Sequence, residues 1–335
     1  MDIDVFVAAH QHEWQRLDAL CKRRGRLSGT EADELVALYQ RAATHLSLVR
    51  SAAPDPALVG RLSALVAAGR SAVTGARSSG WRDAARYFTR SFPAALYRTS
   101  SWWMPTMLVC WVVAALAGWW VAENPHVQAS LAAPEEIRQL TRPGGDFETY
   151  YSSEPAAAFA TQVWVNNAWV AAQCLAFGAF LGIPVLYVLA VNILNVAASA
   201  GLMASVGRLD VFFGLILPHG LLELTVVFIA AGAGLRLGWT VIDPGPRPRA
   251  RALAEEGRAA IGMVVGLGVV LLISGAIEGF VTPSGLPTWA RVGIGVLAEV
   301  VFLVYVFVLG RRVAAQGELG DVEAADRTDV APAAA

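Results

Sequence analysis

Apolar residues dominate the chain from residue 104 onward, in runs long enough to cross a lipid bilayer. A hydrocarbon core about 30 Å thick needs about 20 consecutive apolar residues in a helix. Residues 159–206 are almost free of charge over more than two such lengths, which predicts two spans separated near Gly182 and Pro184. Further single spans are predicted at residues 104–121, 211–235, 259–281 and 292–309, which makes about six transmembrane helices.

The first hundred residues show a different pattern, in which apolar residues recur at helical spacing among polar ones. Phe6, Trp14, Leu17 and Leu20 follow this spacing in the first such stretch. Three amphipathic helices are predicted, over residues 2–24, 30–50 and 57–73. Their apolar faces are buried only if they pack together, so residues 1–100 are predicted to form a small helical domain.

A basic and aromatic segment joins this domain to the first span. Between Trp81 and Trp103, arginines alternate with aromatic residues. This composition is typical of a helix that lies against anionic lipid headgroups. We therefore predict an interfacial helix whose membrane-surface residues are Arg82, Arg86, Arg90 and Arg98.

The distribution of charge predicts the orientation in the membrane. Basic residues concentrate before residue 103, whereas the polar loop at 123–160 is acidic. The positive-inside rule then places the N-terminus in the cytoplasm and this loop outside. Six spans return the C-terminus to the cytoplasm, where residues 314–335, polar and alanine-rich, are predicted to be disordered.

Composition excludes some classes of function. The 335 residues are 56% hydrophobic and 16% charged, with a net charge of −1, so no strongly basic surface is available for nucleic acid. Cys21, Cys110 and Cys174 form no disulfide framework or metal-binding motif, and the histidines at 10 and 12 do not share a helix face. No cofactor and no metal are predicted.

The span at residues 211–235 carries the most informative polar residues. Pro218 should kink the helix, and Gly220 adds local freedom. His219 and Glu223 are four residues apart and therefore share a face. A carboxyl group near the bilayer centre costs roughly 2.5–3.5 kcal/mol, so it must be shielded from lipid. Three interpretations stay open: a buried polar lock between helices, a proton, ion or substrate path, and catalysis, for which a third ligand or nucleophile is missing.

Other spans contribute further polar residues to a predicted buried intramembrane cluster. The asparagines are predicted to bond between helices. Glu278 is expected near the outer interface, where water can reach it, and Glu299 is expected to couple to Glu223. Glycines or alanines four apart, as at Gly178 and Gly182, predict close helix packing. Together with the residues of the 211–235 span, the cluster comprises Pro218, His219, Gly220, Glu223, Asn166, Asn167, Asn195, Glu278 and Glu299.

Several of these stretches together resemble the stage II sporulation protein M family of bacterial integral membrane proteins. The matching residues are Asn166-Asn167, Leu217-Pro218-His219-Gly220 with Glu223 and Leu224, the glycine-rich 231–235, and Glu278 through Pro283. The N-terminal helices resemble the cytoplasmic extension of longer members. The resemblance implies a non-enzymatic scaffold of the cell envelope, because the family's namesake localises peptidoglycan hydrolases.

The leading hypothesis is therefore a multi-pass protein of the bacterial cytoplasmic membrane that organises membrane or cell-wall-associated protein partners. The alternative is a transporter or an ion or proton pathway that uses His219, Glu223 and Glu299. An intramembrane hydrolase, which requires a bound metal, is the third hypothesis. The lipid bilayer is a partner in every case, and a homo-oligomer stays open.

Overall fold

The computed structural model of the chain describes residues 3–23, 27–52, 56–73, 80–152, 155–318 and 320. All regular secondary structure in these residues is helical. The chain divides into two compact units, Met1–Arg82 and Asp83–Ala335. The predicted all-α architecture, a membrane bundle with a helical N-terminal part, is thereby confirmed. Residues 321–335, most of the tail predicted to be disordered, lie outside the described residues.

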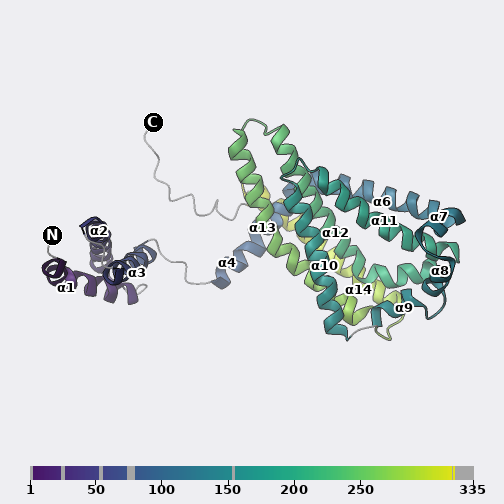
Figure 1. Cartoon of the computed structure of the whole chain (residues 1–335), viewed down its shortest axis with the longest axis horizontal. Helices are drawn as coiled ribbons and strands as arrows, with labels where there is room; N and C mark the ends of the chain where they lie inside the picture. The colour runs from purple at the N-terminus through teal and green to yellow at the C-terminus, as the bar shows by residue number, and fades with distance from the viewer. Residues whose placement is uncertain are drawn as a thin grey trace. The chain divides into compact units, whose positions relative to one another are not determined.

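The described residues of the N-terminal unit up to Val73 form α1 (Ile3–Lys22), α2 (Gly29–Ala52) and α3 (Pro56–Val73), each within a few residues of its predicted range. They pack against one another, as Figure 1 shows. Leu17, Leu20, Val49 and Leu62 are buried at their interface, as their helical spacing predicts. The unit thus has a hydrophobic core of its own.

The second unit begins with short helical segments and continues with long helices. In chain order they are α4 (Gly80–Arg86), η1 (Tyr87–Ser91), α5 (Phe92–Arg98), α6 (Ser100–Glu123), α7 (Pro125–Leu131), α8 (Pro134–Thr141), α9 (Asp146–Thr149), η2 (Tyr150–Ser152), α10 (Ala156–Phe177), α11 (Ile183–Ser205), α12 (Leu209–Ile242), α13 (Arg249–Ala276), η3 (Ile277–Val281), α14 (Thr288–Val304), η4 (Tyr305–Gly310) and α15 (Arg311–Ala314).

Among the described residues of this unit, five helical stretches are long and apolar enough to cross a membrane. They are Ser100–Glu123, Ile183–Ser205, Leu209–Ile242, Arg249–Val281 and Thr288–Ala314. The remaining predicted span forms α10, which has 22 residues and is long enough to cross. Its hydropathy is lower because it carries Gln162, Asn166, Asn167 and Gln173.

Helix α12 is the centre of the second unit. It packs against α6, α10, α11, α13 and α14, and Figure 1 shows it among them. Its residues from Val226 to Ala233 are buried on all sides. A helix that is apolar all round is stable only when other helices enclose it. The stretch at 211–235 therefore organises the membrane bundle.

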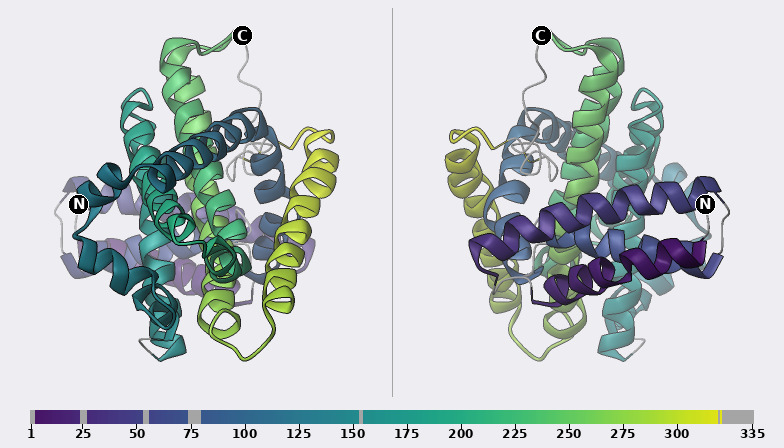
Figure 2. Two further views of the ribbon diagram at one scale, coloured as in Figure 1. Left: turned by 90° about the vertical axis from the view of Figure 1, so that its right-hand side faces the viewer. Right: turned by 90° about the vertical axis from the view of Figure 1, so that its left-hand side faces the viewer.

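Helices α12 and α13 form an antiparallel hairpin that extends past the ends of neighbouring helices (green in Figures 1 and 2). With 34 residues, α12 is about 51 Å long, more than a bilayer core requires. Ion pairs hold the extension together: Arg236 Nη2 lies 2.8 Å from Glu256 Oε1, and Arg247 Nη2 lies 3.2 Å from the same oxygen.

Small residues let the helices of this unit approach closely, as predicted. A Cβ atom at Gly178 would lie 2.4 Å from the carbonyl oxygen of Gly234, and one at Gly201 would lie 2.6 Å from that of Gly118. Helix α15 also packs against α5, so the described chain enters and leaves the bundle at the same end. This agrees with an even number of crossings.

The basic and aromatic segment belongs to the second unit. Arg86, Arg90 and Arg98 are exposed, whereas Phe92 and Leu96 of α5 are buried against the bundle. The boundary between the units therefore falls after Arg82 and not near residue 100, because burying these apolar side chains joins α5 to the membrane helices. The side chain of Arg82 lies outside the described part of the structure.

Candidate functional site

The polar centre of the membrane unit is a cluster of His219 and Glu223 from α12 and Glu278 from η3. Ligand atoms of the three side chains all lie within 4.8 Å of one another. His219 Nε2 is 3.6 Å from Glu278 Oε1, and both side chains are buried. Glu223 is partly buried. The predicted pair His219 and Glu223 thus acquires a third member from another helix.

The local fold of α13 positions Glu278. At Ile277 the helix widens into the π-turn η3, and the amide of Thr282 donates to the carbonyl of Ile277 at 3.1 Å. Such single π-turns are frequent at functional sites, because they re-aim side chains without ending the helix. Here the turn is the segment that presents Glu278 and Thr282 to His219.

The imidazole of His219 is held by neighbours on several elements. Its Nδ1 lies 3.3 Å from the hydroxyl oxygen of Thr282, and the ring of Tyr151 lies 5.7 Å away between centroids. The backbone carbonyl of His219 accepts a hydrogen bond from Ser274 Oγ at 3.0 Å. These contacts join α12, η2 and the end of α13 around one residue.

The three intramembrane carboxyl groups have different neighbours from those predicted. Glu278, expected to be hydrated near the interface, is only 4% exposed, and its Oε2 has no hydrogen-bond partner among the described residues. Glu299, expected to couple to Glu223, instead accepts a hydrogen bond from Thr225 Oγ1 at 2.9 Å. The neighbour of Glu223 is Glu278, because α13 and not α14 presents a carboxyl group at that level.

One signal in the sequence pointed to Glu278. Antiparallel helices joined by a short turn bring together residues at similar distances from that turn. Measured from the turn at 243–248, His219 and Glu278 lie within about two helical turns of each other. The Glu278–Thr282 spacing of four also mirrors the spacing of His219 and Glu223.

The remaining predicted cluster residues have separate surroundings. Pro218 and Gly220 are buried in α12, which continues through the proline as one helix. Asn167 donates to the carbonyl of Val163 in its own helix at 3.1 Å. Asn166 and Asn195 are exposed on the unit and do not belong to the buried cluster. Within the described part of this chain, these three asparagines form no hydrogen bond between helices, because their helices turn the amides outward or along their own backbones.

A depression of about 550 Å³ opens next to the His219 cluster. Its walls include Tyr151 and Thr282, both of which also contact His219. Glu148, Asp210 and Arg291 add charge to the lining, and Arg291 Nη1 donates to the carbonyl of Thr282 at 2.7 Å. The polar cluster is thereby placed just behind the wall of a polar opening.

On the side of the cluster away from this depression, α12 continues with apolar residues. Residues Val226 to Ala233 are buried, and their side chains carry no polar group. The polar residues His219, Glu223 and Thr225 therefore occupy only the half of the helix nearer the opening. This arrangement suits a binding site better than a continuous polar path.

The N-terminal unit holds a second titratable cluster, of His10, Glu13 and His45. The rings of His10 and His45 lie 4.1 Å apart, and Trp14 Nε1 donates to His45 Nδ1 at 3.2 Å. Burial, and then the neighbouring His10, lower the pKa of His45 from its usual 6.5. The histidine that meets His10 is thus His45, which comes from another helix, and not its neighbour in sequence at position 12.

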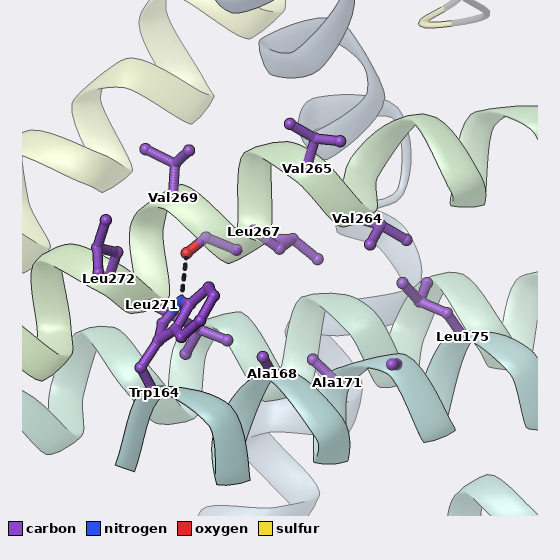
Figure 3. A pocket seen from close by; sticks show the side chains of 12 residues that line it. Trp164, Ala168, Ala171, Leu175, Val264, Val265, Leu267, Val269, Leu271 and Leu272 are labelled. Carbon is purple, nitrogen blue, oxygen red and sulfur yellow. Dashed lines mark hydrogen bonds between the residues drawn. The ribbon is translucent and has the colours of Figure 1, made fainter. Parts of the chain in front are cut away.

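The outer surface of the membrane unit carries an apolar groove between α10 and α13. Residues of both helices line it, among them Trp164 and Ala168 of α10 and Leu271 of α13, and Figure 3 shows the hydrogen bond from Trp164 Nε1 to the carbonyl of Gly268, which is 2.9 Å long. Beside this groove, α10 exposes Gln162, Asn166 and Trp169 on one stripe. An exposed stripe with two amides is unusual for a membrane-spanning helix.

Comparison with known proteins gives two family matches. A model described as SpoIIM, Stage II sporulation protein M, matches residues 107–283, more than half of the chain, and this range includes His219, Glu223 and Glu278. A model described as a domain of unknown function (DUF8413) matches residues 4–75, the three helices of the N-terminal unit. No curated protein and no solved structure matches the chain.

Proposed function

Because the chain belongs to the stage II sporulation protein M family, we propose that it is a non-enzymatic membrane scaffold that holds partner proteins at the bacterial cell envelope. The membrane unit is the anchor, and α10 binds a transmembrane helix of a partner. The N-terminal unit offers a separate surface, on the cytoplasmic side in the orientation that the charge distribution favours.

The exposed amide stripe of α10 is the observation that carries this proposal. Gln162, Asn166 and Trp169 are spaced by four and three residues, so they lie on one face of the helix. An amide in hydrocarbon without a partner costs several kcal/mol on alkane transfer scales. A second helix that pairs with these amides removes that cost and gains roughly 1–2 kcal/mol for each bond at best.

The test compares two neighbouring asparagines in native membranes. Asn166→Leu removes an exposed amide, whereas Asn167→Leu removes an amide that bonds to its own helix. Cross-linking followed by mass spectrometry should recover membrane partners with the wild type and with N167L. We expect N166L to lose most of these products, because the binding face has lost its polar contact.

Two results would contradict the proposal: a wild-type protein without cross-linked partners, or an identical partner set for N166L. A second copy of the chain among the products would identify α10 as a homo-oligomer interface instead. Deletion of residues 1–82 separately tests the N-terminal surface, since soluble partners should then disappear while the membrane partners are retained.

An ion or proton pathway has less support than the scaffold function. Glu299 is bonded to Thr225 and not to the His219 cluster, and the buried residues from Val226 onward are apolar. Flux measured in proteoliposomes, abolished by Glu223→Gln, would favour the pathway over the scaffold.

A further inference from the structure

We propose that His219, Glu223 and Glu278 bind one divalent transition-metal cation, of the kind represented by Zn²⁺, inside the membrane unit. This site is independent of the scaffold function. It joins α12 to the end of α13 at the point where η3 interrupts the regular helix.

The geometry of the three side chains fits a single ion. Zinc is bound by imidazole nitrogen and carboxylate oxygen at about 2.0–2.2 Å, so two ligands of a tetrahedral ion are about 3.3 Å apart. His219 Nε2 and Glu278 Oε1 are separated by 3.6 Å, and the ligand atoms of all three residues lie within 4.8 Å. Small side-chain adjustments therefore bring the donors to bonding distance.

The charge of the two carboxylates matches that of one divalent cation. Among the described residues, neither Glu223 nor Glu278 forms an ion pair with lysine or arginine. Two ionised carboxylates this close together in a low-dielectric interior are strongly unfavourable without compensation. A divalent ion neutralises both, and the net charge of the occupied site is zero.

The hydrogen bonds leave the required lone pairs available. The Oε2 atom of Glu278 is buried and has no donor among the described residues. The hydroxyl of Thr282 lies against Nδ1 of His219, which leaves Nε2 directed toward Glu278. Metal-binding histidines are commonly oriented in this way, with one ring nitrogen held by a neighbour and the other on the ion.

The types of ligand atom, and the depression beside the site, indicate the class of metal. One imidazole and two carboxylates favour a transition metal over Mg²⁺ or Ca²⁺, which prefer oxygen ligands alone. The depression lined by Tyr151 and Thr282 reaches the wall of the site, and Asp210 adds a carboxylate to its lining. Three protein ligands leave one coordination position for water.

The N-terminal cluster of His10, Glu13 and His45 is the competing candidate. Two of its ligand groups are partly engaged, because Trp14 donates to His45 Nδ1 and Arg41 Nη1 donates to Glu13 Oε1 at 2.7 Å, while Glu13 Oε2 has no hydrogen-bond partner among the described residues. The experiment nevertheless removes this cluster with His10→Ala, so that any bound metal reports the membrane unit.

The test uses the full chain carrying His10→Ala, in lipid nanodiscs, stripped with a chelator, loaded with Zn²⁺ and washed. Metal content measured by mass spectrometry should be about one Zn²⁺ per chain. Glu278→Gln should reduce it at least tenfold, since the site loses one of three ligands. Glu299→Gln is the matched control: it alters another intramembrane carboxyl group, outside the cluster, and should retain the metal.

A second readout separates lost binding from lost folding. Co²⁺ in the site should give visible absorption bands that are absent in Glu278→Gln, and Zn²⁺ should raise the Tm of the parent protein but not that of the variant. If Glu278→Gln does not fold by circular dichroism, Glu223→Gln provides the same comparison. A parent protein that retains no Zn²⁺, or folded variants that retain as much as the parent, would overturn the proposal.

Discussion

Single residues decide how closely the helices approach the His219 cluster. A Cβ atom built on Gly295 of α14 would lie 2.3 Å from the carbonyl oxygen of Pro218, the residue before His219. A glycine at this position lets the backbone of α14 rest directly on α12. Gly293, two residues earlier, has nothing within 4 Å of the corresponding position. The same residue type is thus essential to packing at one site and neutral at the next.

We expect Gly295→Ala to destabilise the membrane unit by about 1–3 kcal/mol, because the added methyl group forces α14 away from α12. Thermal unfolding in nanodiscs should show a lower Tm for G295A. Gly293→Ala should leave the Tm unchanged, and equal shifts for the two variants would show that α14 does not pack as described.

Among the elements, the segment α7 to α9 between α6 and α10 depends on one arginine. Arg208, which precedes α12, donates to the carbonyl of Thr141 at 2.6 Å and forms an ion pair with Glu148. Phe147 also stacks on Phe212 with ring centroids 5.6 Å apart. The segment that the sequence presents as a polar loop is therefore helical and tied to the bundle.

We expect Arg208→Ala to loosen residues 125–152, because two charge-assisted hydrogen bonds at about 1.5–3 kcal/mol each are lost. Amide hydrogen exchange in this segment should accelerate at least tenfold. Arg138→Ala provides the comparison, since Arg138 pairs with Glu135 on an exposed surface and should change exchange little. Similar acceleration in both variants would argue against a specific role for Arg208.

At the scale of the whole molecule, the chain consists of two units with separate cores, and each matches its own family model. The core of the N-terminal unit includes Trp14 and Leu17 and is enclosed by its own three helices. The free energy of unfolding of this unit should therefore depend on pH in its own way, separately from that of the membrane unit. His45, buried in that unit, makes the dependence measurable.

We expect the N-terminal unit to lose stability at low pH. Its fold favours the neutral imidazole of His45, so the pKa of His45 is lower in the folded unit than in the unfolded chain, where it is 6.5. The free energy of unfolding should fall as the pH drops below about 6.5 and level off below the folded pKa.

Hydrogen exchange of residues 3–73 in the full chain, corrected for intrinsic rates, should show this fall. The effect should shrink in His45→Gln, which keeps an acceptor for Trp14 but does not titrate. A wild type and an H45Q variant with the same pH dependence would assign the effect to other groups.

The sequence alone determined the class of fold, the approximate limits of the long helices, and the central place of residues 211–235. The physical reason is that lipid offers no hydrogen bonds, so a long apolar run must be a helix. Residues such as Gly178 and Gly201 also indicated close packing, because small side chains are what such packing needs.

Only the tertiary structure decided which polar groups meet. The sequence places His219 and Glu223 on one face, but the rotation of α13 and the π-turn at Ile277 select Glu278 over Glu299 as their neighbour. The tertiary structure likewise turns Asn166 outward and buries Phe92 in the bundle. Helix rotations depend on the summed packing of many side chains, which no local pattern contains.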